Sequence, residues 1–366
     1  MKKPFDFWIF TITIVLLAIG TIMIFSASPP SAYIYNDGDA FYFIKKQLLM
    51  VPLSLIAMFV AMKFDYRKLG KMSPVIFGIS IVLLIAVLIP GIGMSLNGAR
   101  RWLIIGFQPS EIVKITLIIF LSHLIAVKGD KIRELFSGVG SCLLYTGIVV
   151  VLLALEPHYS AAIIIIMIAF ILMFCGGVNL LHIGAMGAVG GSMLGFAMLV
   201  SSHSRLRITT FISSLFDESQ LGWQVGNSLI AIGSGGLFGK GLNNSTEKFL
   251  YIPEPHNDFI LSILAEELGF ICVALVFVLF AILIFRGYRV AIGVKDKQGS
   301  LMAIGITSMI AIQFIFNVGV VSGILPATGI PLPFFSYGGT SLILLMGAMG
   351  ILLNISKNSD YARVKK

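Results

Sequence analysis

Charged residues are scarce in this sequence. Asp, Glu, Lys and Arg make up only 12% of 366 residues, whereas a typical soluble domain has about a quarter. This scarcity excludes a soluble enzyme with a polar surface, and it equally excludes a disordered chain. Cysteine is also rare. Cys142, Cys175 and Cys272 each lie within an apolar run, so we expect them to pack as small side chains and not to form a disulfide or metal framework.

Long apolar segments make up most of the sequence. The sequence is 57% hydrophobic, with a mean hydropathy of +0.98. About 20 apolar residues are needed for a helix to cross a bilayer. We therefore predict an all-α, polytopic membrane protein that forms a single integral-membrane domain over residues 1–366. Its ten expected transmembrane helices are 7–26, 46–63, 73–91, 109–127, 138–155, 160–176, 181–201, 258–285, 300–324 and 337–356.

The net charge of +9 is distributed unevenly between the connecting segments. With the N-terminus placed inside, the inner segments carry seventeen Lys and Arg residues and the outer segments carry eight. Such a bias is typical of cytoplasmic loops, so the basic balance does not indicate nucleic acid as a partner. An even number of helices then predicts that both termini are cytoplasmic.

One predicted outer connection, about 202–257 between the seventh and eighth helices, is much longer than an ordinary loop of about 4–6 residues. It contains many apolar and aromatic residues, so we expect a folded extracytoplasmic cap. Its glycine-rich run at 233–241 suggests a phosphate-binding loop. However, Ser234 replaces the first glycine of a Walker A motif and Gly241 replaces its Ser or Thr, so we favour a tight turn.

Several polar groups lie in or beside predicted helices. Glu111 and Lys114 are spaced i, i+3 and share a helix face. An ionisable pair within a span faces a cavity or a partner, which leaves a structural and a functional role equally open. Glu156 and His158 occupy a very short turn between the fifth and sixth helices, where they could contact a ligand or simply be solvated.

The richest polar stretch is 251–259. Its two prolines hold the chain extended before His256. Asp258 then falls near the start of the eighth helix, where it could act as a helix N-cap or as a functional acid together with Glu254 and His256. Ser262 lies at i+4 from Asp258, and Glu266 lies deeper in the helix, where an acid needs a partner or a wet cavity.

A second irregular stretch covers 323–340. Its prolines and glycines cannot all belong to one regular helix. Irregular backbone at membrane depth must line a cavity or be buried in protein. We expect Ser336 and Tyr337 to supply polar edges to such a cavity.

Together these motifs resemble the SEDS family (shape, elongation, division and sporulation), which includes RodA and FtsW, over nearly the whole chain. Five motifs carry the resemblance, namely Gly98–Leu103, Gln108–Lys114, Ile230–Leu237, Pro253–Phe259 and Gly329–Gly339. The resemblance implies a ten-helix membrane glycosyltransferase that polymerises lipid II at the outer face of the cytoplasmic membrane. It also implies a partner, a class B penicillin-binding protein that cross-links the strands. Details around 223–228 and 255–257 favour the division and sporulation branch.

The family resemblance implies that Asp258 is catalytic. Its carboxylate would act as general base toward the acceptor 4-hydroxyl in one inverting displacement, with a lipid diphosphate as the leaving group. We expect substrate to be bound by Arg100, Arg101, Trp102, Glu111, Lys114, His158, Lys240, Lys248, Glu254, His256, Ser262 and Ser336. Basic residues or a divalent cation such as Mg²⁺ or Mn²⁺ would stabilise the diphosphate, and no nucleotide is needed because the donor is already activated.

The adjacent residues Arg100 and Arg101 should not be equivalent. Treated as successive residues of a regular helix, their side chains would point about 100° apart. We therefore expect one of them to face the cavity and the other to face solvent or lipid headgroups. The alternative is that both arginines only anchor the interface by snorkelling.

Two other functions fit the same span pattern. A lipid II flippase would also need a polar cavity and broken helices, but its charged cavity residues should be accessible from both leaflets. Here the candidate cavity residues gather on the outer side together with the long loop, namely Arg100, Arg101, Glu156, His158 and Asp258. A non-catalytic scaffold for the transpeptidase would not need Asp258.

Overall fold

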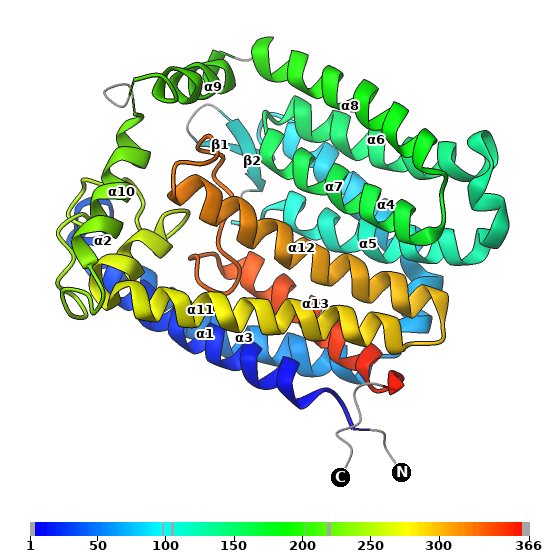
Figure 1. Ribbon diagram of the computed structural model, residues 1–366, viewed down its shortest axis with the longest axis horizontal. Helices are drawn as coiled ribbons and strands as arrows, with labels where there is room; N and C mark the ends of the chain where they lie inside the picture. Colours follow the sequence, from blue (N-terminus) through cyan, green and yellow to red (C-terminus); the bar gives the residue numbers. More distant parts are fainter. Residues whose placement is uncertain (1–3, 97–98, 104–105, 201, 218–220, 361–366) are drawn as a thin grey trace.

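The computed structural model describes residues 4–96, 99–103, 106–200, 202–217 and 221–360. Its described residues are mostly helical, and the elements follow one another along the chain (Figure 1). They are α1 Phe7–Ala27, α2 Pro29–Tyr35, α3 Tyr42–Lys63, α4 Tyr66–Leu88, β1 Gly93–Leu96, β2 Ala99–Leu103, α5 Pro109–Lys128, η1 Gly129–Arg133, η2 Leu135–Val139, α6 Gly140–Leu155, α7 Tyr159–Gly176, α8 Leu180–Val200, α9 Ser202–Ser214, α10 Trp223–Gly235, α11 Ile260–Gly293, α12 Lys297–Val321 and α13 Gly339–Ser356.

The predicted all-α, polytopic architecture is confirmed. Among the described residues, nine helices are long and apolar enough to cross a membrane. The seventh predicted span, 181–201, coincides with α8, which is not one of those nine. The predicted long connection, about 202–257, contains the two helices α9 and α10.

Two departures from the sequence prediction stand out, although other helix ends, such as the start of α4 at Tyr66, also differ by several residues. The short antiparallel hairpin β1–β2 interrupts the helical pattern, with Gly93 opposite Leu103 and a register shift after Met94. Helix α11 runs to Gly293 and not to residue 285, because it continues past the apolar segment into the basic stretch that begins at Arg286.

The helices expose apolar side chains on one side and bury apolar side chains on the other. On α3, for example, Leu49, Ile56 and Val60 are exposed while Met58 is fully buried. The exposed apolar surface suits lipid tails, which are as apolar as the side chains that face them. The buried face of α3 packs on α13, and a Cβ added to Gly350 of α13 would lie 2.3 Å from the Met58 carbonyl oxygen.

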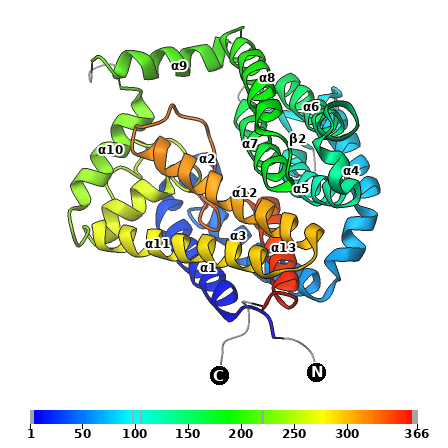
Figure 2. The same cartoon turned by 45° about the vertical axis from the view of Figure 1, so that its right-hand side comes forward.

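The first and last described residues lie at the same end of the helix bundle. The backbone N–H of Asp6 donates to the Ser356 hydroxyl over 3.0 Å, and the Asp6 carboxylate pairs with Arg286 near the end of α11. The hairpin β1–β2, helix α10 and the irregular segment 323–338 lie at the opposite end (Figure 1). We call this opposite end the hairpin end. Figure 2 shows α9 standing apart from the packed helices on that side, whereas α10 packs on α11 through contacts such as that between Ser228 and Ser262.

Candidate functional site

Asp258 is held in an irregular turn at the hairpin end. Helix α11 begins at Ile260, and its N-cap residue, Phe259, makes no side-chain capping bond, so Asp258 does not cap the helix. The Asn317 side-chain amide of α12 donates to the Asp258 carbonyl over 2.7 Å and to the Ile330 carbonyl over 2.9 Å. This bridge holds the Asp258 backbone against the segment 323–338. It engages only the backbone carbonyl, so the carboxylate can contact a ligand.

The residues before Asp258 are bonded to the same segment. The Ser336 hydroxyl donates to the Asn257 carbonyl over 2.9 Å, and the Tyr337 N–H donates to the His256 carbonyl over 2.9 Å. The buried His256 ring packs against Phe43 of α3, with 4.1 Å between ring centroids and the two rings tilted by 34°. The two irregular segments that the sequence singled out therefore form one structure.

Burial also fixes the protonation state of His256. It lowers the pKa of the imidazole to about 4, because a charged ring would lose its hydration there. At neutral pH His256 is therefore uncharged, which suits aromatic packing better than proton transfer.

Two arginines face the Asp258 carboxyl. Burial and the Glu254 charge raise the pKa of Asp258 to about 6, while Arg207 of α9 and Arg101 of β2 oppose that rise. The Arg207 guanidinium also donates to the Ala327 carbonyl over 3.2 Å. Asp258 is thus a carboxylate that ionises close to neutral pH beside two permanent positive charges.

Arg100 and Arg101 lie on strand β2 and not on a helix, which corrects the helical geometry assumed from the sequence. Successive strand residues point to opposite faces, so the two side chains still separate. Arg100 is exposed, whereas Arg101 donates to the Pro157 carbonyl and has an unpaired Nε among the described residues. Trp102, the next residue, is partly buried in the same hairpin opposite Met94.

The turn between α6 and α7 brings two more polar groups to this place. Glu156 is only 1% exposed, and neither of its carboxylate oxygens has a partner among the described residues. Burial raises the Glu156 pKa to about 8 despite the opposing charge of Arg101. Burial, followed by the charges of Arg101 and Lys114, lowers the pKa of His158 well below its usual value. Unpaired buried polar groups are costly, so a ligand that forms hydrogen bonds with this turn would remove that cost.

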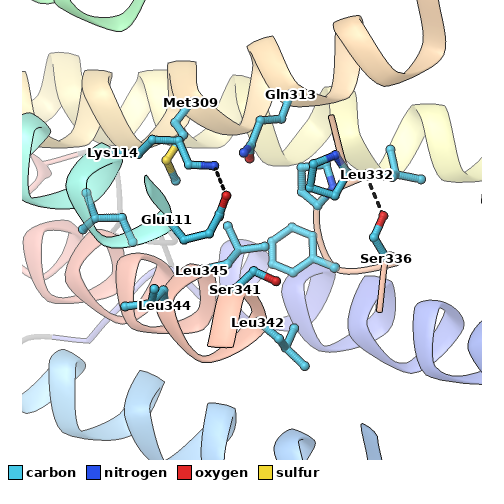
Figure 3. A pocket seen from close by; sticks show the side chains of 14 residues that line it. Glu111, Lys114, Met309, Gln313, Leu332, Ser336, Ser341, Leu342, Leu344 and Leu345 are labelled. Carbon is cyan, nitrogen blue, oxygen red and sulfur yellow. Dashed lines mark hydrogen bonds and ion pairs between the residues drawn. The ribbon is translucent and has the colours of Figure 1, made fainter. Parts of the chain in front are cut away.

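Glu111 and Lys114 of α5 form the predicted ion pair, with 2.8 Å between carboxylate and ammonium. The pair lines a cavity under the segment 331–336, and Ser336 lines the same cavity. In Figure 3 Gln313 of α12 also points toward this space. The Ser336 hydroxyl, which contacts the residue before Asp258, links the cavity to the acid.

Three predicted substrate-binding residues lie elsewhere. Ser262 is fully buried, and its hydroxyl contacts that of Ser228 at 2.7 Å, so it joins α10 to α11. Lys240 pairs with Glu266 over 2.6 Å and Lys248 pairs with Glu267 over 2.9 Å. Lys248 is only 1% exposed, and an ammonium in that state cannot reach a lipid diphosphate without breaking a buried ion pair.

Arg207, Asn317 and Gln313 were not selected from the sequence. Arg207 was counted only as an outer charge, and nothing in its neighbourhood pointed to Asp258. Asn317 and Gln313 did carry a signal, because polar side chains within an apolar span face the bundle interior or a cavity. Among the described residues, no three His, Cys, Asp or Glu side chains form a group that could hold a metal ion. A divalent cation would therefore need substrate oxygens as well as Asp258 or Glu156 as ligands.

Sequence comparison places the chain among proteins of bacterial wall synthesis. Residues 7–361 match the FtsW/RodA/SpoVE family, described as cell cycle proteins. The chain is 42% identical to stage V sporulation protein E of Bacillus subtilis over 365 residues, which cover 98% of this chain and 99% of that one. It is 37% identical to the probable peptidoglycan glycosyltransferase FtsW of Trichlorobacter lovleyi, with 97% and 95% of the two chains covered.

Solved structures share the architecture. A chain from a structure described as showing structural coordination of polymerization and crosslinking by a peptidoglycan synthase complex superposes with a TM-score of 0.77 and 25% identity. The match covers 96% of this chain and 97% of that one. The rod shape determining protein RodA of Thermus thermophilus superposes with a TM-score of 0.71 and 26% identity, over 97% and 98% of the two chains.

Proposed function

This chain belongs to the SEDS family of FtsW, RodA and SpoVE, and we infer that it is a peptidoglycan glycosyltransferase of the division and sporulation type. The observation that carries this proposal is the Asp258 carboxyl, which lies within electrostatic reach of Arg101 and Arg207 at one end of a bundle of membrane-spanning helices. The substrate is lipid II, and the product is a glycan strand.

Asp258 acts as the general base in this proposal. The 4-hydroxyl of the acceptor sugar gives its proton to the carboxylate while its oxygen attacks the anomeric carbon of the donor. The bond from that carbon to the diphosphate breaks in the same step, and the lipid diphosphate leaves with the electron pair. A base whose pKa is about 6 suits this task, because it is ionised at neutral pH and still accepts a proton readily.

Arg101 and Arg207 stabilise the leaving diphosphate. Negative charge grows on the diphosphate oxygens as the bond breaks, so cations fixed in advance lower the barrier. Both guanidiniums are anchored by backbone carbonyls, those of Pro157 and Ala327, and this leaves further N–H groups of each for a ligand. A divalent cation bound through substrate oxygens would add charge at the same place.

The cavity beside Glu111 and Lys114 binds part of the lipid II headgroup. Its lining combines one ion pair with Gln313 and Ser336 on an otherwise largely apolar wall. Such a lining is typical of small-molecule sites, in which a few polar groups fix the orientation of the ligand.

The hairpin end faces the outside of the cytoplasmic membrane, and both termini are cytoplasmic. The bias of basic residues toward the connections at the opposite end supports this orientation. The solved relative described as part of a peptidoglycan synthase complex supports a cross-linking partner, which we take to be a class B penicillin-binding protein.

The test is polymerisation of labelled lipid II by the purified chain in detergent or vesicles, with and without its partner. The proposal expects glycan strands from the wild-type chain and none from the Asp258→Asn variant. If lipid II crosses vesicle bilayers without forming polymer, the chain is a flippase. If the Asn variant supports the partner as well as the wild type does, the chain is a scaffold.

A further inference from the structure

Helix α11 is broken at Gly269, and another segment repairs the break. The φ and ψ of Gly269 are 76° and 179°, which no helix contains. A break leaves carbonyls before it and N–H groups after it without helical partners. The segment after α10 supplies both kinds of partner. Lys240 and Gly241 donate N–H groups to the carbonyls of Glu266 and Glu267, and Phe270 and Ile271 donate to the carbonyls of Gly236 and Leu237, over 2.9–3.2 Å.

The glycine-rich run at 233–241 makes this contact possible. A Cβ on Gly235 would lie 2.0 Å from the Ala265 carbonyl oxygen, and a Cβ on Gly239 would lie 2.2 Å from the Glu267 carbonyl oxygen. Any side chain at either position would push the two backbones apart. The run is therefore neither a phosphate loop nor a simple turn, since it docks backbone to backbone on a broken helix. We call residues 235–248 the clasp.

Two buried carboxylates secure the clasp. Glu266 and Glu267 are both 0% exposed, and they point at the clasp from the last turn before the break. Glu266 pairs with Lys240, and it also accepts from the N–H of Thr246 over 3.0 Å. Two ionised carboxylates this deep would be prohibitively costly without such partners. The clasp must therefore stay where its lysines and N–H groups can reach them.

Glu267 is held from two sides. It pairs with Lys248 of the clasp and accepts from the Ser26 hydroxyl of α1. Lys248 in turn donates to the Asn243 side-chain carbonyl over 2.7 Å. The clasp is thus fixed to α1 as well as to α11, and α1 gives the break a rigid support.

The half-helix between the clasp and Asp258 transmits any movement at the break. Residues 260–268 rise by about 13 Å at 1.5 Å per residue, so a tilt of about 10° at Gly269 would move Asp258 by about 2 Å. A misplacement of about 1 Å can reduce a rate by about 100-fold. The structure assigns Lys248, Glu267 and the clasp the role of positioning Asp258 for catalysis. The kinetic test of this role rests on the proposed function, because it measures polymerisation of lipid II.

A matched pair of glycine variants tests this role. Gly233 and Gly235 both lie in α10, but a Cβ on Gly233 would meet nothing within 4 Å. In the lipid II assay with the partner present, Gly235→Ala should lower kcat by about 10- to 100-fold and leave KM within about twofold, while Gly233→Ala should match the wild type. A Gly235→Ala variant with wild-type kcat would overturn the positioning role.

A second set of variants covers the case in which Gly235→Ala does not fold. It removes the two partners of the Lys248–Glu267 ion pair, first singly and then together, and the double variant leaves the net charge unchanged. Lys248→Met and Glu267→Gln should each impair kcat, because each leaves a buried charge unpaired. The double variant should recover part of the loss. Additive losses in the double variant, or a raised KM for Lys248→Met alone, would assign Lys248 to the substrate and refute the proposal.

Hydrogen exchange separates this inference from the proposed function. The amides of residues 251–259 should exchange faster in Gly235→Ala than in Gly233→Ala, and this comparison needs no lipid II. If the wild-type chain makes no polymer but exchange differs as expected, the proposed function fails and the clasp stands. Equal exchange in the two variants would refute the clasp even if polymer forms.

Discussion

Replacing Asp258 with Asn should make the protein more stable and inactive. In the folded protein the pKa of Asp258 is about 6, against an ordinary value of 3.8. Above pH 6 the carboxyl is ionised in both the folded and the unfolded state, and burial penalises only the folded one. The difference corresponds to at most about 3 kcal/mol of lost stability. Asn keeps the shape and removes the charge.

The sign of the effect depends on pH. Below about pH 3.8 both states are protonated and the penalty vanishes, so the stability gain of Asp258→Asn should grow as pH rises from 3.8 to about 6 and be complete above pH 6. Thermal unfolding in detergent at pH 4 and pH 7.5 measures that gain, and polymerisation of lipid II measures activity. Wild-type activity should fall as pH drops through about 6. An inactive variant that is also less stable at pH 7.5 would refute this reasoning, because Asp258 would then be structural.

Three further predictions concern the surroundings of Asp258. Glu111→Ala and Lys114→Ala should each cost about 3–5 kcal/mol of unfolding free energy, and the double variant should be no worse than the worse single variant, as a double-mutant cycle would show; additive losses would contradict the pairing. Arg101→Gln should lower kcat about 100-fold or more, and it should move the acidic limb of the pH–rate profile to higher pH because a charge that opposes the raised Asp258 pKa is lost. The kcat of Arg100→Gln should stay within about twofold of the wild-type value. Equal losses in the two variants would contradict a diphosphate contact by Arg101 alone. Metal analysis after chelation and gel filtration should find less than one divalent ion per chain and an unchanged melting temperature, whereas a stoichiometric, stabilising ion would reveal a protein-only site.

Much of the candidate site was predictable because its residues sit at breaks in a strong apolar pattern. The prolines just before His256 and those between Gly329 and Tyr337 lie in irregular segments between predicted spans, and irregular backbone at membrane depth has few permitted uses. That these two breaks bond to each other, through Ser336 and Asn257, could not be deduced, since they lie 79 residues apart in sequence.

Lys240 and Lys248 show which contacts the linear sequence could not reveal. Lys240 and Lys248 seemed suited to a diphosphate because few basic residues lie in the connections predicted to be outside. The sequence also indicated that Glu266 needs a partner. The sequence order alone could not show that the partner of Glu266 is one of these lysines. That pairing depends on the break at Gly269 and on the glycine-rich run that docks there.

The amino-acid sequence by itself determined the all-α class and nearly every membrane-spanning helix, because both follow from local apolar composition, and its motifs drew attention to Asp258. Only the tertiary structure decided which charges meet. It placed Arg207 of α9 beside Asp258, and it engaged Lys248 with Glu267. Hydrophobic burial selects helices from segments of about 20 residues, whereas charges in a low-dielectric interior act over a few ångströms, a distance that only the folded chain defines.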